Sequence, residues 1–321
     1  FAKFAVTSTY GSINVSDGTT VNLAQQNYLA ASLQALPPTG ARVRDFAAVG
    51  LLPFGLRQPE SLSLTQTPVS ADGSQITATA TTSNIVLHLD PTSAYAGILI
   101  GSGASIIADP QSAISMTAGG ALTVLGGIIA PSGSISLANN GSPLAVTYSA
   151  INGYTASGNS FAAQDVWIGA NAVLDVAGTL IPALKPNAAP TALPGGSITL
   201  SVANTGVAQP GSLFDIAGAS ATVLAPGGGG LGGTRETAEL IWSNGGTLNL
   251  VDAASSTQPD ASLYFGSTIM AQGGLDPTTG QGVPQASGGT LNVGASASQL
   301  VANIGAGGFL NIIRQSGDVT A

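Results

Sequence analysis

The chain has 321 residues, of which 7% are charged and 44% hydrophobic, and it contains 44 glycines and no cysteine. Its net charge of −8, with only 7 Lys and Arg residues, argues against nucleic acid as a partner, because backbone phosphates require a basic face. The apolar content separates it from disordered chains, which are poor in branched apolar residues. We therefore expect a folded protein that does not bind nucleic acid.

The length exceeds what one compact core usually contains, since such cores stop growing near roughly 250–300 residues. A solenoid escapes this limit because each coil packs only on its neighbours. The first residues, Phe1-Ala2-Lys3, include no initiating Met, and no long apolar stretch follows them. We expect these residues to be part of a longer or processed polypeptide.

Residues 1–74 are predicted to form a less regular N-terminal segment. Short apolar runs at 4–6 and 13–15 predict strands. Residues 22–36 predict a short helix, because Leu29, Leu33 and Leu36 recur at helical spacing and two prolines follow. Residues 39–68 concentrate charges and predict a long excursion or extended, linker-like stretch; these charges belong to Arg42, Arg44, Asp45, Arg57 and Glu60.

Residues 75–321 are organised by a glycine-led unit, seen most clearly in GGALTVLGGIIAPSGSISL at 119–137. Glycine corners separate short strands in which branched apolar residues alternate with small ones. The unit returns as GGSITL, GGTLNL and GGTLNV, beginning at 195, 245 and 288. Further strands are predicted at 75–80, 85–89, 300–304 and 310–313. Inward positions are expected at Ile98, Ile100, Ile106, Ile107, Ile114 and Met116.

A second type of strand, with different apolar spacing, is predicted at 166–168, 173–176, 213–216 and 263–265. Segments rich in Gly, Ser, Asn and Pro predict insertions at about 142–165, 181–194, 219–247 and 273–287. Parallel strands need crossover connections, and helices are scarce in this sequence, so further strands must make them. The predicted fold is an all-β, right-handed parallel β-helix with loop excursions and a short N-terminal helix. A β-sandwich is the alternative.

Two apparent ligand motifs are better interpreted as structural. Gly227, Gly229 and Gly232 match the dinucleotide-binding pattern GxGxxG, but no strand–helix–strand alternation surrounds them, and Pro226 interrupts the approach. A glycine-rich loop is the preferred interpretation. His88 is the only histidine, and strand alternation makes it a solvent-facing residue rather than a metal ligand. We expect no cofactor and no metal site.

Two pairs of polar residues occur at equivalent positions of the repeat. Asp175 and Asp215 lie between apolar residues in similar strands and could face the same side of neighbouring coils. They could form a glycosidase pair or a weak calcium site, but outward residues that confer solubility are the preferred interpretation. Asn249 and Asn292 share one place in the GGTLN copies, which predicts a hydrogen-bonded ladder along the axis.

The chain resembles the filamentous haemagglutinin-like exoproteins of the two-partner secretion systems of Gram-negative bacteria. The resemblance is carried by the glycine-led units, by VWIGANAVLDVAGTL at 166–180 and by PGSLFDIAGASATV at 210–223. The stretch ARVRDFAAVGLLPFGLRQPESLSL at 41–64 is similar to segments found between coil arrays in larger members. The amino-terminal secretion domain of that family is not recognisable in this sequence.

The resemblance implies a secreted or cell-surface rod that acts in adhesion, aggregation or biofilm structure and has no catalytic residues. Its implied partners are surface glycans or proteins, and an outer-membrane transporter that engages another part of the parent chain. Alternatives are a filament or surface-layer subunit that self-associates through coil ends, and a polysaccharide-binding or polysaccharide-cleaving protein. Contacts are expected on the loops at 142–165 and 221–247, at Tyr148, Tyr154, Phe161 and Trp242.

Overall fold

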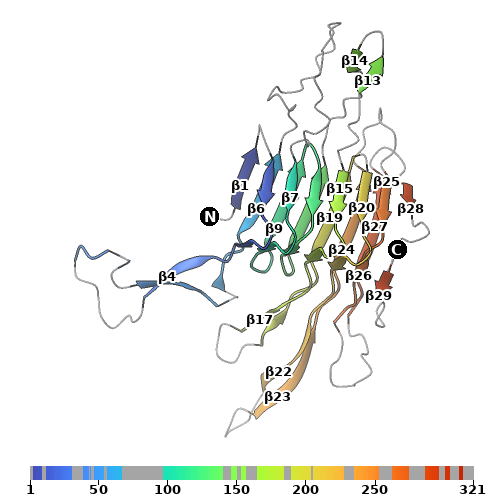
Figure 1. The fold of residues 1–321 in the computed structure, drawn as a ribbon. Coiled ribbons are helices and arrows are strands. Elements are labelled where there is room, and N and C mark those ends of the chain that lie inside the picture. Colours follow the sequence, from blue (N-terminus) through green and yellow to red (C-terminus); the bar gives the residue numbers. More distant parts are fainter. Residues whose placement is uncertain are drawn as a thin grey trace.

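The computed structural model contains strands and turns but no α-helix in the residues it describes (Figure 1). Twenty-one strands form three parallel sheets of seven strands each, called sheets A, B and C. The described residues are 3–8, 12–30, 39–42, 44, 47–53, 56–66, 97–139, 146–149, 153–156, 165–183, 189–203, 205–227, 235–252, 262–274, 286–295, 301–303 and 311–313.

The strands of each sheet follow one another across the sheet in chain order. Sheet A consists of β1 (Lys3–Ser8), β6 (Ser61–Gln66), β9 (Ala113–Ala118), β12 (Ser134–Asn139), β19 (Ser197–Val202), β24 (Thr247–Asp252) and β27 (Thr290–Ala295). Sheet B consists of β2 (Ile13–Val15), β7 (Ile98–Ile100), β10 (Leu122–Val124), β15 (Asp165–Ile168), β20 (Thr205–Ala208), β25 (Ser262–Phe265) and β28 (Val301–Asn303). Sheet C consists of β3 (Thr20–Asn22), β8 (Ser105–Ile107), β11 (Gly127–Ile129), β16 (Val173–Asp175), β21 (Leu213–Asp215), β26 (Thr268–Met270) and β29 (Asn311–Ile313).

The chain visits the three sheets in a constant order. It runs from sheet A to sheet B to sheet C and then returns to sheet A one strand further along. Each such circuit through the three sheets is called one pass. The all-β prediction is confirmed, as are the strands expected at 166–168, 173–176, 213–216 and 263–265, which belong to sheets B and C. This order is compatible with a β-helix, in which strands replace helices as crossover connections.

The core consists of rows of apolar side chains that cross the sheets. Along the strands of sheet A, buried and partly exposed residues alternate, as expected where one face of a strand is covered. Successive Cα pairings align one buried row through Leu62, Ile114, Ile135, Ile198 and Leu248. The rings of Phe214 and Phe265 pack at 5.0 Å between centroids, which joins sheet C to sheet B. Such rows hold neighbouring passes together mainly by burying apolar surface.

Glycine doublets mark the entry to sheet A because the backbone of one pass lies directly on that of the next. A Cβ atom added to Gly196 would overlap the carbonyl oxygen of Gly133, and one added to Gly246 would overlap that of Gly196. The same carbonyls accept hydrogen bonds from Ser197 N (3.0 Å) and Thr247 N (2.9 Å). The doublets recognised in the sequence therefore serve close backbone approach.

The helix predicted at 22–36 is wrong for the residues that the structure describes there. Gln26–Ala30 form strand β4, which pairs antiparallel with β5 (Ala47–Leu51); residues 31–36 lie outside the described part. In β4 more and less exposed residues alternate; Leu29 is opposite Ala48, and its side chain lies beside Gly50, the diagonal neighbour on β5. The pairing of β4 with β5, which is distant in sequence, thus decided the local conformation against the helical spacing of the leucines.

Five of the six expected inward residues are buried, and Ile107 is the exception. Ile106 and Ile107 are adjacent in β8, so alternation sends them to opposite faces, and Ile106 takes the core position. The strands predicted at 300–304 and 310–313 overlap β28 and β29. Those predicted at 75–80 and 85–89 lie outside the described residues.

Connections of nine or more residues, called long here, occur at two of the three corners, and the longest connection at the third corner, 304–310, has seven residues. Connections are named here by the two sheets that they join. Short turns form the B–C connections at 16–19, 101–104, 125–126, 169–172, 209–212 and 266–267. The long A–B connections span 67–97, 140–164 and 253–261, and the second of these contains the hairpin β13–β14 (Val146–Ser149 and Gly153–Ala156). Both corners with long connections border sheet A.

The C–A connections contain three antiparallel ribbons. These are β4–β5, β17–β18 (Leu180–Ile181 and Thr191–Ala192) and β22–β23 (Ser220–Gly227 and Arg235–Trp242). The ribbons β17–β18 and β22–β23 coincide with the insertions expected at 181–194 and 219–247. Strands β1, β2, β3 and β6, from the segment expected to end at residue 74, belong to the same three sheets as the later strands.

Candidate functional site

The three predicted contact residues that the structure describes lie on two different connections. Tyr148 and Tyr154 are directly opposite each other in β13–β14, within an A–B connection. Trp242 ends β23, within a C–A connection, and its side chain is 42% exposed. Phe161 lies outside the described residues. The described residues therefore lie at opposite borders of sheet A, the tyrosines between sheets A and B and Trp242 between sheets C and A.

The two aspartates expected to face the same side are aligned on neighbouring strands. Asp175 of β16 and Asp215 of β21 are direct Cα partners in sheet C, and both are partly exposed. Each carboxylate accepts a hydrogen bond from the N–H two residues on: Ala177 N at 2.8 Å and Ala217 N at 3.0 Å. Aspartate commonly makes this local turn bond. Both carboxylates thus shape the chain as it leaves sheet C.

The environment of Asp215 opposes its ionisation. Burial raises the pKa of the Asp215 carboxyl above its ordinary value, and the Asp175 carboxylate adds to this rise, although the hydrogen bond from Ala217 N partly offsets it. A raised carboxyl pKa is useful in acid–base chemistry, yet catalysis also requires further groups at the same place. Among the described residues no group of three or more His, Cys, Asp or Glu side chains is placed to hold a metal ion.

The aspartate pair predicts a specific pH dependence of stability. Because the folded-state pKa of Asp215 is raised, its protonated form contributes stability below the unfolded-state pKa, and this contribution is lost as pH rises through the folded-state pKa. We expect Asp215→Asn to reduce this loss, so that the variant gains stability relative to wild type as pH rises. Urea unfolding between about pH 3 and pH 7 measures the effect. Asp175→Asn should produce a smaller change in the same direction. The prediction would be contradicted if the free energy of unfolding changed equally with pH in all three proteins.

The asparagine ladder predicted from the sequence is confirmed. Asn292 Nδ2 donates to Asn249 Oδ1 at 2.9 Å, and Asn249 Nδ2 donates to Thr199 Oγ1 at 3.2 Å. These residues continue a row of small polar side chains on the outer face of sheet A, which runs through Ser63, Ser115, Ser136, Thr199, Asn249 and Asn292. This row therefore contributes one uncharged polar residue to the outer face of sheet A at each of six successive strands.

The glycine stretch has a structural role where it is described. Gly227 is the last residue of β22 and is opposite Arg235 in an antiparallel ribbon, and Pro226 belongs to the same strand. A dinucleotide fingerprint instead requires a strand that leads through a glycine turn into a helix. Gly229, Gly232 and His88 lie outside the described residues.

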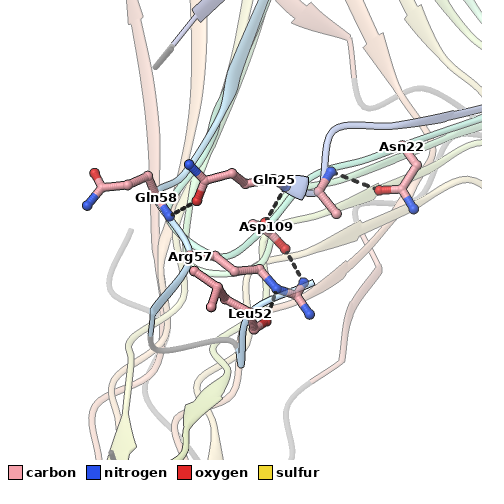
Figure 2. Close-up of polar contacts among 7 residues, drawn as sticks. Asn22, Gln25, Leu52, Arg57, Gln58 and Asp109 are labelled. Carbon is pink, nitrogen blue, oxygen red and sulfur yellow. Dashed lines mark hydrogen bonds and ion pairs between the residues drawn. The ribbon is translucent and has the colours of Figure 1, made fainter. Parts of the chain in front are cut away.

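A buried ion pair, which the sequence pattern did not reveal, anchors the β4–β5 ribbon. Arg57 Nη1 lies 2.7 Å from Asp109 Oδ1, and the two side chains are only 12% and 5% exposed. Figure 2 shows the surrounding bonds: Asp109 Oδ2 accepts from Gln25 N at 3.2 Å, and Arg57 Nε donates to the Leu52 carbonyl at 2.6 Å. The only sequence signal was the concentration of charge near Arg57, because its partner lies 52 residues away.

No family model, curated protein or solved structure matches the chain. Within the described residues, no helix has the length and apolar character needed to cross a membrane.

Proposed function

We propose that the chain is a non-catalytic, right-handed parallel β-helical rod, secreted or displayed at the outer cell surface, that acts in adhesion, cell aggregation or matrix structure. The observation that carries this proposal is the restriction of long connections to the two corners that border sheet A. A stacked body provides a rigid support, and insertions at its corners add contact surface without disturbing the stack.

The β-helix is supported by the constant order of sheets. Each return to sheet A pairs the new strand in parallel with the strand of the preceding pass, as in β9 with β12 and β12 with β19. Right-handed crossovers dominate parallel connections within one sheet, so the proposed handedness follows from the direction in which twisted strands pack back on a sheet.

The adhesive partners proposed are glycans or proteins of host or bacterial surfaces. Export would use an outer-membrane two-partner secretion transporter that engages another part of the parent chain. The one observation that favours polysaccharide binding or cleavage instead is the alignment of Asp175 with Asp215. Their shared use of backbone N–H groups as hydrogen-bond donors supports a structural role.

The test compares two tryptophans of similar exposure in different settings. Trp242 is 42% exposed on the β22–β23 ribbon, and Trp167 is 37% exposed on β15 of sheet B. We expect Trp242→Ser to reduce adhesion of protein-coated beads to bacterial or host cells severalfold, since exposed aromatic residues often dominate contact energy. Trp167→Ser should leave adhesion near wild type.

A second variant removes the β13–β14 loop. Residues 140–164 are replaced by Gly-Gly-Ala, the connection that joins β9 to β10 at 119–121. We expect reduced adhesion with an unchanged β-type circular dichroism spectrum. If both this variant and Trp242→Ser adhere like wild type, the proposed location of the contacts is wrong.

A further inference from the structure

The β4–β5 ribbon exposes an apolar face. Tyr28 and Val49 are opposite each other, which places them on the same face, and they are 60% and 58% exposed. Leu51, 46% exposed, follows Val49 by two residues and therefore lies on that face as well. An isolated two-stranded ribbon is marginally stable in water unless an apolar face packs against something. This face thus has the properties of an unfilled interface.

The base of the ribbon is fixed to the body. The buried Arg57–Asp109 pair and the bond from Gln25 N to Asp109 Oδ2 connect its two ends to the turn after β8, and the bond from Gln58 N to Gln25 Oε1 at 2.8 Å joins these ends to each other (Figure 2). An apolar face presented on such an anchored support loses less conformational freedom when it binds. The anchor therefore favours binding over local rearrangement.

The charge of this segment differs from that of the rest of the chain. Residues 24–58 contain three arginines and one aspartate, whereas the remaining residues contain four basic and fourteen acidic side chains. Arg57 is buried and paired with Asp109, so the positive surface charge of this segment comes from Arg42 and Arg44, both of which are exposed. A cationic segment on an otherwise acidic protein is attracted to the body of another copy. An anionic bilayer would attract the segment but repel the remainder.

A matching apolar face exists on the β22–β23 ribbon. Trp242, Leu240 and Ala238 alternate along β23 and so share one face, on which Trp242 and Ala238 are exposed. The two ribbons leave from the first and fifth passes, about four strand spacings or ~19 Å apart along the stack. Figure 1 shows them diverging from the body. Two sheets that pack face to face lie about 10 Å apart, which is less than the separation of these ribbons in one molecule. The two faces can therefore contact each other between molecules rather than within one.

We propose that the β4–β5 face of one molecule binds the Trp242 face of the β22–β23 ribbon of a second copy. The contact is heterologous, with different surfaces on the two partners, so it propagates into open chains or closes into rings. Such self-association does not depend on the adhesive function proposed above.

Sedimentation velocity of the purified chain over a concentration series tests the proposal. We expect wild type to form larger species as concentration rises. Tyr28→Ser/Val49→Ser and Trp242→Ser should each weaken association by roughly tenfold or more, because each removes exposed apolar anchors from one side of the contact. Trp167→Ser is the matched control and should associate like wild type. Circular dichroism and urea midpoints verify that all variants are folded.

Mixing the two defective proteins gives the decisive measurement. The Tyr28→Ser/Val49→Ser protein retains an intact Trp242 face, and Trp242→Ser retains an intact β4–β5 face, so the mixture should form a 1:1 complex and nothing larger. A mixture that stays monomeric while wild type associates would overturn the proposal. It would also be overturned by a wild type that stays monomeric and instead binds phosphatidylserine vesicles through Tyr28 and Val49, which would identify a lipid surface as the occupant.

Discussion

Gly196→Ala is expected to destabilise the folded chain by at least about 3 kcal/mol. The added Cβ would overlap the carbonyl oxygen of Gly133, which is backbone and cannot rotate away as a side chain could. That carbonyl also accepts the hydrogen bond from Ser197 N, so relief of the overlap would lengthen a bond between neighbouring passes. Urea or thermal unfolding measures the loss.

Gly127→Ala is the matched control for this substitution. Gly127 also lies in the body, at the start of β11, but the nearest atom to its added Cβ is the Val173 carbonyl oxygen at 4.0 Å. We expect a change within about 1 kcal/mol, because alanine there meets only ordinary contact and restricts the unfolded chain. Equal losses for the two variants would show that close stacking of the glycine corners is not what Gly196 provides.

Asp109→Ala is expected to cost about 3–5 kcal/mol, because it leaves the Arg57 guanidinium buried without its carboxylate. The loss should be accompanied by faster amide hydrogen exchange in β4 and β5, since Asp109 also accepts from Gln25 N immediately before β4. Chemical unfolding and hydrogen exchange with mass spectrometry measure the two effects.

The double variant Arg57→Met/Asp109→Leu separates an unpaired charge from lost packing. Removal of both charges should cost less than Asp109→Ala alone, since no buried charge remains without a partner. Glu239→Ala, at an exposed position of β23, should change stability by no more than about 0.5 kcal/mol. A double variant that is less stable than Asp109→Ala would contradict the dominant role of the buried charge.

The repetitive part of the chain could be predicted because its signals are local. Alternation in GGSITL and GGTLNL identifies strands of sheet A, and the shared position of Asn249 and Asn292 identifies their ladder. Equivalent positions in a stacked repeat must become neighbours, so Asp175 and Asp215 could also be expected to align. Composition alone predicts the lack of a basic nucleic-acid surface.

The remaining features depend on contacts between residues far apart in the chain. The pattern at 22–36 has helical spacing, but pairing of β4 with β5 decided the conformation of residues 26–30 within it. Arg57 and Asp109 meet only because the ribbon returns to the turn after β8. The placement of every long connection beside sheet A likewise follows from the order of the sheets. In the repetitive part of the chain, local periodicity determines which residues form strands and which side of each strand is buried. The position of ribbons and buried charges is decided by packing energy that exists only once the passes are stacked.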